Sequence, residues 1–156
     1  YNSILEINSY KSLSIIKLSN IYETNPMYKI DQNKFLNLVI KFKTSLNPVD
    51  LLNALQEIEF KIGRPKSRIK NSSRIIDLDI LTYDNQIINR ENLKIPHPKI
   101  SERPFVLIPI YEIDNCFTIP GDKRNIKTII DSINKNDVKL NKVINLEDVK
   151  TLPYSN

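Results

Sequence analysis

Residues 73–81 carry the pattern that most restricts what this chain can fold into. Apolar and acidic residues alternate there, and successive side chains of a β-strand point to opposite faces of a sheet. The pattern predicts a strand with Asp77 and Asp79 on one face, about 7 Å apart, and aliphatic side chains on the other. Two carboxylates so placed repel each other unless a cation lies between them. Their oxygen atoms suit Mg²⁺, with phosphate oxygens completing its coordination, and Arg74 lies just upstream, where it can meet a phosphate.

This pair of acids has two interpretations when it is taken alone. Most surface carboxylates are solvated and bind nothing, so a bare Asp-x-Asp motif is weak evidence for a metal site. The aliphatic residues around the motif and the basic segment before it favour the metal. The pattern therefore predicts an enzyme that acts on phosphoryl groups, with Asp77 and Asp79 as the metal ligands.

Glycine is scarce, because the chain contains only Gly63 and Gly121. Neither a P-loop nor a dinucleotide-binding glycine loop can be built from two glycines so far apart. Bound phosphates would have to be held by cationic side chains and a metal. Residues 64–74 are strongly basic, and we expect a loop that can close over a polyphosphate. A solvated loop or a nucleic-acid patch are the alternatives.

Composition excludes several classes of protein. At 156 residues the chain suits one domain with a real core, and no apolar run is long enough for a membrane span. The net charge of +5 favours anionic partners. A single cysteine, Cys116, excludes an internal disulfide framework and fits a reducing, cytoplasmic location. We expect Cys116 to be a small core residue.

The order of predicted elements indicates the fold class. Residues 3–11, 47–63, 101–113 and 124–133 read as helices, and residues 13–23, 35–45, 73–81, 87–88 and 117–121 read as strands. This order is consistent with an α+β, ferredoxin-like α/β sandwich with a mostly antiparallel sheet, whose first strand is missing from the given chain. We expect an N-terminally incomplete domain over residues 1–135 and a C-terminal extension or linker over residues 136–156.

Three further side chains carry ambiguous signals. His97 is the only histidine, and a lone histidine is more often structural than functional; it can contact a phosphate, but too few soft ligands accompany it for zinc. Phe35 would ordinarily be a core residue, as would Phe105. Phe35 shares a strand face with Asn37, however, and an aromatic ring beside an amide can bind a flat heterocycle.

Several motifs occur in one order at compatible spacing. They are Ile21-Tyr22-Glu23-Thr24, Phe35-Leu36-Asn37, Ile58-Glu59-Phe60-Lys61-Ile62-Gly63-Arg64, Arg74-Ile75-Ile76-Asp77-Leu78-Asp79-Ile80, Pro96-His97-Pro98 and Arg103-Pro104-Phe105. As an ordered set they resemble the 6-hydroxymethyl-7,8-dihydropterin pyrophosphokinase family of folate biosynthesis. The similarity covers roughly residues 1–133.

The resemblance implies a ferredoxin-like fold and a reaction that moves the β,γ-diphosphate of ATP onto the hydroxymethyl group of the pterin, releasing AMP. It also implies the nucleotide half of the site. Asp77 and Asp79 match ligands of two Mg²⁺ ions, and Arg64 and Arg74 match groups that grip ATP phosphates and stabilise charge in catalysis. The other matching positions near the nucleotide are Gln56, Glu59, Lys66, His97 and Arg103.

The pterin half follows from the same resemblance. Phe35 and Phe105 match the aromatic pair that sandwiches the pterin ring, and Asn37 and the Thr24 backbone match groups that hydrogen-bond its edge. In some organisms this enzyme is fused to dihydropteroate synthase or dihydroneopterin aldolase, and a domain from such a fusion fits the missing first strand and the long tail.

Two other functions stay open at this stage. A basic ferredoxin-like RNA-binding module is favoured by the charge and the basic loop, although the chain lacks the aromatic run of such modules and puts two acids on an inner strand. A non-catalytic remnant within a larger folate-pathway protein is the other alternative. The main prediction is an enzyme with ATP and the pterin as substrates, and with neither nucleic acid nor membrane as partner.

Overall fold

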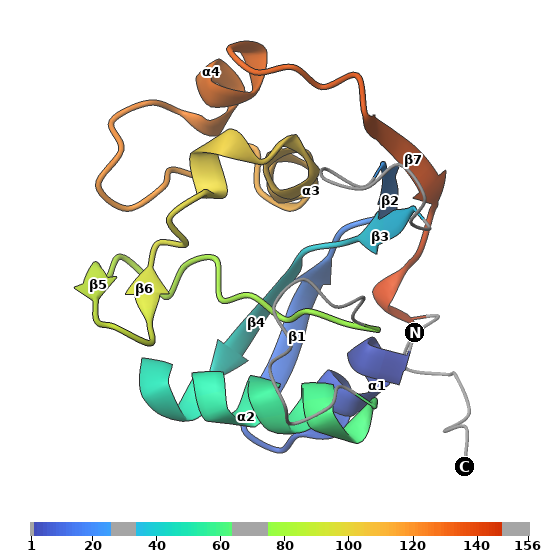
Figure 1. Ribbon diagram of the computed structural model, residues 1–156, viewed down its shortest axis with the longest axis vertical. Coiled ribbons are helices and arrows are strands. Elements are labelled where there is room, and N and C mark those ends of the chain that lie inside the picture. The colour runs from blue at the N-terminus through green and yellow to red at the C-terminus, as the bar shows by residue number, and fades with distance from the viewer. Residues whose placement is uncertain (1, 26–33, 64–74, 148–156) are drawn as a thin grey trace.

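The computed structural model describes residues 2–25, 34–63 and 75–147 (Figure 1). Helices α1 (Asn2–Ser9) and α2 (Pro48–Lys61) lie at one end of a bent antiparallel ribbon, and helix α3 (Pro104–Ile113) lies near its other end. All of the strand pairs among the described residues are antiparallel. The fold class is therefore α+β, as predicted for a ferredoxin-like sandwich.

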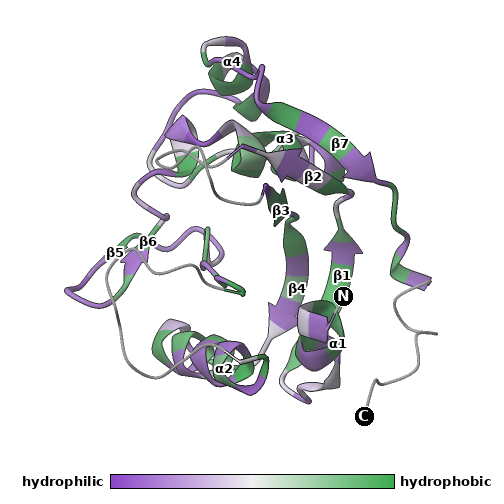
Figure 2. Ribbon diagram, turned by 45° about the vertical axis from the view of Figure 1, so that its right-hand side comes forward, coloured by the Kyte–Doolittle hydropathy of each residue, from purple (hydrophilic) through white to green (hydrophobic). Residues whose placement is uncertain are grey.

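Helix α2 begins and ends where its sequence predicts. The Asn47 side chain accepts hydrogen bonds from the backbone N–H groups of Val49 (3.0 Å) and Asp50 (3.1 Å), which satisfies two donors of the first turn. Gly63 follows the last turn with φ of +108°, a conformation that suits glycine. The helix is banded in hydrophilic and hydrophobic colours (Figure 2), because one face is solvated and the other is buried. The buried residues are Leu51, Ala54, Leu55, Ile58 and Glu59.

Each of the two long strands predicted for the first half of the chain is divided into two. The pieces are β1 (Leu13–Leu18), β2 (Ile21–Thr24), β3 (Phe35–Asn37) and β4 (Ile40–Thr44). β1 pairs with β4, and β2 pairs with β3. The break falls at Ser19 and Val39: the fully buried Ser19 hydroxyl accepts a hydrogen bond from Val39 N at 2.8 Å, where a regular ladder would use a carbonyl.

The polar segment after residue 134 contains a further strand. β7 (Val138–Lys142) pairs with β2, so that Thr24 lies opposite Val138 and Ile21 lies opposite Lys142. Ile144, just beyond it, is buried in the core formed by α1, β1 and α2. Residues 138–144 therefore pack on the sheet, although their sequence pattern is weak.

The expectation that residues 75–81 form a strand is wrong in this structure. They run in an extended path without a ladder partner among the described residues. Their backbone is instead tied to two other elements: Leu78 N donates to the Glu59 carboxylate at 2.6 Å, and Leu81 O accepts from His97 N at 2.8 Å. A helix side chain and a loop thus supply contacts that a neighbouring strand would otherwise make.

The segment after residue 81 builds the second half of the domain. A small hairpin joins β5 (Ile88–Asn89) to β6 (Lys94–Ile95), close to the predicted strand at 87–88. Helix α3 begins at Pro104 instead of following a cap at Ser101, because Pro104 suits a first helical turn and residues 100–102 form a 3₁₀ turn. The predicted strand at 117–121 is reduced to one bridge between Thr118 and Asn125.

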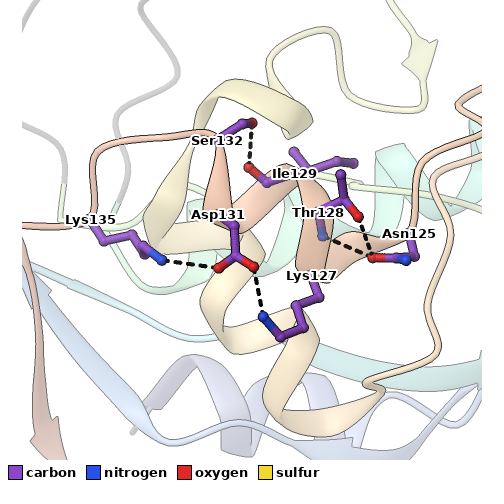
Figure 3. A network of polar contacts seen from close by, with 7 residues as sticks. All are labelled: Asn125, Lys127, Thr128, Ile129, Asp131, Ser132 and Lys135. Atoms are coloured by element: carbon purple, nitrogen blue, oxygen red, sulfur yellow. Dashed lines mark hydrogen bonds and ion pairs between the residues drawn. The ribbon is translucent and has the colours of Figure 1, made fainter.

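Helix α4 (Ile126–Asp131) packs on a hydrophobic core that it shares with helix α3. The Asn125 side chain accepts hydrogen bonds from the backbone N–H and the hydroxyl of Thr128, which caps the helix (Figure 3). The Asp131 carboxylate forms ion pairs with Lys127 and Lys135 on the exposed side of the helix. Ile126 and Ile129 point inward against the core that also holds α3.

Two remaining expectations have clear outcomes. Cys116 is exposed in the turn after α3, so the prediction of a core cysteine is wrong. The turn places its thiol beside the Asn115 side chain at 3.3 Å instead of under a helix. No helix within the described ranges is long and apolar enough to cross a membrane.

Candidate functional site

The acidic segment keeps its predicted alternation without being a strand. Asp77 and Asp79 are exposed, whereas Ile76, Leu78 and Ile80 are partly buried. Leu78 and Ile80 pack on the core beneath helix α2. The two carboxylates therefore share the outer side of the segment, as the sequence predicts.

Asp79 meets two cationic or titratable side chains from distant parts of the sequence. Arg103 Nη1 donates to Asp79 Oδ2 at 3.0 Å, and His97 Nε2 lies 3.6 Å from the same oxygen. His97 Nδ1 accepts the backbone N–H of Lys99 at 3.1 Å, so its other ring nitrogen is the one that faces Asp79. The structure thus brings together three residues that lie in separate sequence motifs.

The electrostatics of this cluster favour a neutral imidazole. Burial lowers the pKa of His97 below its usual value of 6.5, and the positive charges of Arg103 and Lys99 lower it further. The carboxylates of Asp79 and Asp77 oppose this shift but do not cancel it. At neutral pH, His97 is therefore predominantly uncharged, and because Nδ1 accepts the Lys99 N–H, its ring proton is on Nε2, which can donate one hydrogen bond.

A cleft of about 250 Å³ opens beside this cluster. Asp79 and His97 line one part of it, and the β5–β6 hairpin lines the other through Asn92 and Lys94. Leu52 of α2 contributes an apolar wall. Neither Asn92 nor Lys94 was predicted from the sequence, although the position of Lys94 two residues before Pro96-His97 was a usable signal.

The residues expected to hold a flat ring come from β2, β3 and α3. On β2 and β3, Asn37 Nδ2 donates to the Thr24 hydroxyl at 3.0 Å, and Phe35 lies directly opposite Thr24 in the strand pair. Phe35 is 45 % exposed, which is unusual for a phenylalanine in a core role. Phe105 lies in the first turn of α3, with the Arg103 guanidinium 5.8 Å from its ring centroid.

Helix α3 and strand β2 are joined directly. The Glu112 carboxylate accepts hydrogen bonds from Asn20 N (3.0 Å) and from the Tyr22 hydroxyl (2.9 Å). Partial burial and this hydrogen bond raise the pKa of Tyr22 to about 12. These contacts fix the helix that carries Phe105 against the strand that carries Thr24.

The two α2 residues of the predicted site differ in exposure. Gln56 is exposed, whereas Glu59 is only 3 % exposed and accepts a hydrogen bond from the backbone of the acidic segment. Arg64, Lys66 and Arg74 lie outside the described residues.

The donor set fits a magnesium ion that is shared with a phosphorylated ligand. Within the described ranges, no group of three or more His, Cys, Asp or Glu side chains gathers as a metal site. Asp77 and Asp79 offer only hard carboxylate oxygens, and Mg²⁺ commonly binds one or two carboxylates while water and phosphate oxygens fill its remaining positions.

Comparison with known proteins gives the family. Residues 2–115 match the family model described as 7,8-dihydro-6-hydroxymethylpterin-pyrophosphokinase. The chain is 43 % identical over 135 residues to the folic acid synthesis protein fol1 of Pneumocystis carinii. The aligned residues cover 86 % of this chain and 18 % of that protein. It is 42 % identical over 107 residues to the 2-amino-4-hydroxy-6-hydroxymethyldihydropteridine pyrophosphokinase of Bacillus subtilis, covering 69 % of this chain and 64 % of that protein.

A third relative is covered more fully. The pyrophosphokinase of the same name from Haemophilus influenzae is 37 % identical over 117 residues, which are 75 % of this chain and 72 % of that protein. The chain spans less than two thirds of the Pneumocystis and Bacillus relatives. The family match nevertheless covers most of the chain and includes the Asp79, His97 and Arg103 cluster. The chain therefore belongs to the 7,8-dihydro-6-hydroxymethylpterin-pyrophosphokinase family.

Proposed function

We propose that this protein transfers diphosphate from ATP to the hydroxymethyl group of 6-hydroxymethyl-7,8-dihydropterin, giving AMP and the pterin diphosphate in folate biosynthesis. The observation that carries this proposal is the meeting of Asp79, His97 and Arg103 beside one cleft. An acid, a neutral imidazole and a guanidinium at one place form a suitable environment for a metal-bound triphosphate. Membership of the family supports the same reaction.

The proposed chemistry is one displacement at phosphorus. The substrate hydroxyl oxygen bonds to the β-phosphorus, the bond from that phosphorus to the α–β bridging oxygen breaks, and the hydroxyl proton is released. Asp77 and Asp79 would hold Mg²⁺, as two ions in our proposal. When bound, the metal would neutralise phosphate charge and help to align the reacting groups. The Arg103 guanidinium would then be available to phosphate oxygens, and neutral His97 could donate from Nε2 to another.

The pterin ring is assigned to the β2–β3 end of the domain. Phe35 is exposed enough to stack on a ring, and Phe105 is the second aromatic of the proposed pair. Asn37 and the Thr24 backbone would bind the polar edge of the ring. The Arg103 guanidinium, which touches both Asp79 and the Phe105 ring, lies between the two halves.

Four further residues complete the proposed site. Gln56 is exposed on α2 and is assigned to the nucleotide. Arg64, Lys66 and Arg74, all cationic, are assigned to ATP phosphates on the resemblance alone. The fused partner, if this chain is part of a longer protein, is proposed to be dihydropteroate synthase or dihydroneopterin aldolase. The single cysteine supports a reducing, cytoplasmic location.

The test is AMP release from Mg-ATP with and without the hydroxymethyl-dihydropterin. Asp79→Asn should abolish pterin-dependent AMP release while the circular dichroism spectrum stays unchanged. Asp84→Asn is the matched control, because Asp84 is an exposed aspartate in a nearby turn and its φ of 45° suits asparagine. Salt-sensitive RNA binding without AMP release would instead favour the RNA-binding alternative, and full activity of Asp79→Asn would contradict the metal assignment.

A further inference from the structure

We infer that Glu59 is a positioning residue that holds Asp77 and Asp79 in place from behind, by binding the backbone between them. The inference rests on the proposed function, because it assigns a task to the acidic segment. Glu59 Oε1 accepts the Leu78 N–H at 2.6 Å, and Leu78 is the residue that separates the two aspartates. The resemblance had placed Glu59 near the nucleotide, which is a different role.

The contacts that hold the backbone of the acidic segment come from a helix side chain and a loop. Among the described residues, no strand pairs with residues 75–81. Leu78 N is bonded to helix α2 through Glu59, and Leu81 O is bonded to the loop through His97 N. Burial alternates along this segment, so that Leu78 faces inward while Asp77 and Asp79 on either side of it face outward. The hydrogen bond from Leu78 N to Glu59 therefore anchors the stretch of backbone from which both carboxylates project.

The burial of Glu59 makes its hydrogen bonding inside the protein necessary. Its side chain is 3 % exposed and lies on the same face of α2 as Leu55 and Ile58. Glutamate is rarely buried, since removing a polar group from water costs free energy unless hydrogen bonds replace its hydration. A leucine there would extend the apolar stripe of α2 but could not accept the Leu78 N–H.

Glu59 differs from Gln56, which lies three residues earlier on the same helix, in its exposure to solvent. Gln56 is exposed and can reach a ligand in solvent, whereas the Glu59 carboxylate points beneath the acidic segment. Residues that orient metal ligands commonly change metal affinity or activity by about 10- to 100-fold when they are mutated. Glu59 should behave in this way without touching ATP or metal.

The experiment compares three variants of the chain. Glu59→Leu removes the acceptor, and Glu59→Gln keeps an oxygen acceptor without the charge. Glu57→Leu is the matched control, because Glu57 is on the same helix but is exposed, where it accepts a hydrogen bond from the Tyr10 hydroxyl. Amide hydrogen exchange at Leu78 reports the bond directly, and electron paramagnetic resonance reports Mn²⁺ binding in the presence of a non-hydrolysable ATP analogue.

We expect slow Leu78 exchange in the wild-type protein, in Glu57→Leu and in Glu59→Gln. Glu59→Leu should exchange Leu78 fast, bind Mn²⁺ about 10- to 100-fold more weakly and lose kcat by a similar factor, with the KM for ATP little changed. Rescue by Glu59→Gln supports the inference. A raised KM for ATP in Glu59→Gln, with kcat intact, would instead assign Glu59 to the nucleotide.

The wild-type exchange measurement keeps the inference falsifiable if Glu59→Leu does not fold. Fast exchange of the Leu78 amide in the native wild-type protein overturns it, whatever the variants do. Wild-type Mn²⁺ binding by folded Glu59→Leu overturns it too. Failure of AMP release in the wild-type protein would instead refute the proposed function, and the Leu78 amide would still report whether Glu59 holds the segment.

Discussion

Arg103 and Asp79 form an ion pair that joins the two halves of the candidate site. Nη1 of Arg103 donates to Oδ2 of Asp79 at 3.0 Å, and the same guanidinium lies 5.8 Å from the centroid of the Phe105 ring. The cation thus contacts an expected metal ligand and an expected ring-binding residue at once. A metal ion that binds Asp79 would compete with this guanidinium for the negative charge of the carboxylate.

The first prediction follows from that competition. Arg103→Gln should bind Mn²⁺ more tightly than the wild-type protein in the absence of nucleotide, because Asp79 loses its internal cation. The pair is partly exposed, with side-chain exposures of 25 % and 41 %, so the gain should be modest, at about 1 kcal/mol or roughly fivefold. Mn²⁺ titration followed by electron paramagnetic resonance measures it.

The control for this titration is Lys99→Gln, which removes a positive charge that acts on the same histidine. Among the described residues, Asp79 is paired with Arg103 and His97 but not with Lys99, so removal of Lys99 should change Mn²⁺ affinity less than removal of Arg103 does. An equal gain in Mn²⁺ affinity for both variants would mean that the total positive charge near the site sets the affinity and that the ion pair between Arg103 and Asp79 does not.

The second prediction concerns the protonation of His97. Burial lowers its pKa below 6.5, so the folded state holds this proton less tightly than the unfolded chain does. Between the two pKa values the unfolded state binds more protons, and stability therefore rises with pH through that window. The contribution of neutral His97 to the free energy of unfolding is complete above about pH 6.5 and is lost as the pH falls through the folded-state pKa.

Proton NMR can check this directly, because the chain contains a single histidine and its ring resonances need no assignment by mutagenesis. The titration midpoint should lie below 6.5, and His97→Gln should flatten the fall in unfolding free energy just below neutral pH. A midpoint above 6.5 would show that the charge on Asp79 outweighs the burial of the ring.

Local patterning predicted some elements of this fold and failed at others for physical reasons. The boundaries of α2 were predictable because Asn47, Pro48 and Gly63 act through their own backbone preferences. The break at Ser19 was not predictable, because a serine within an apolar run is equally suited to a continuing strand. Only its buried hydrogen bond to Val39 reveals the break.

The candidate site shows the same division. Alternation placed Asp77 and Asp79 on one side correctly, although the ladder expected beneath them is absent among the described residues. The meeting of Asp79 with His97 and Arg103 depends on the tertiary path of the chain, which no local spacing encodes. The buried position of Glu59 was missed because glutamate is ordinarily a surface residue.

The third prediction tests the junction at Ser19 that bends the ribbon. Ser19 is fully buried; its hydroxyl donates to Asn20 O at 2.9 Å and accepts from Val39 N at 2.8 Å. Ser19→Ala leaves the Val39 N–H without this acceptor inside the protein, which should lower the free energy of unfolding by about 1–3 kcal/mol. Ser14→Ala, at an exposed position of β1, is the control and should change it by less than about 0.5 kcal/mol. Urea denaturation measures both, and an unchanged midpoint for Ser19→Ala would show that the ribbon bends without this hydrogen bond.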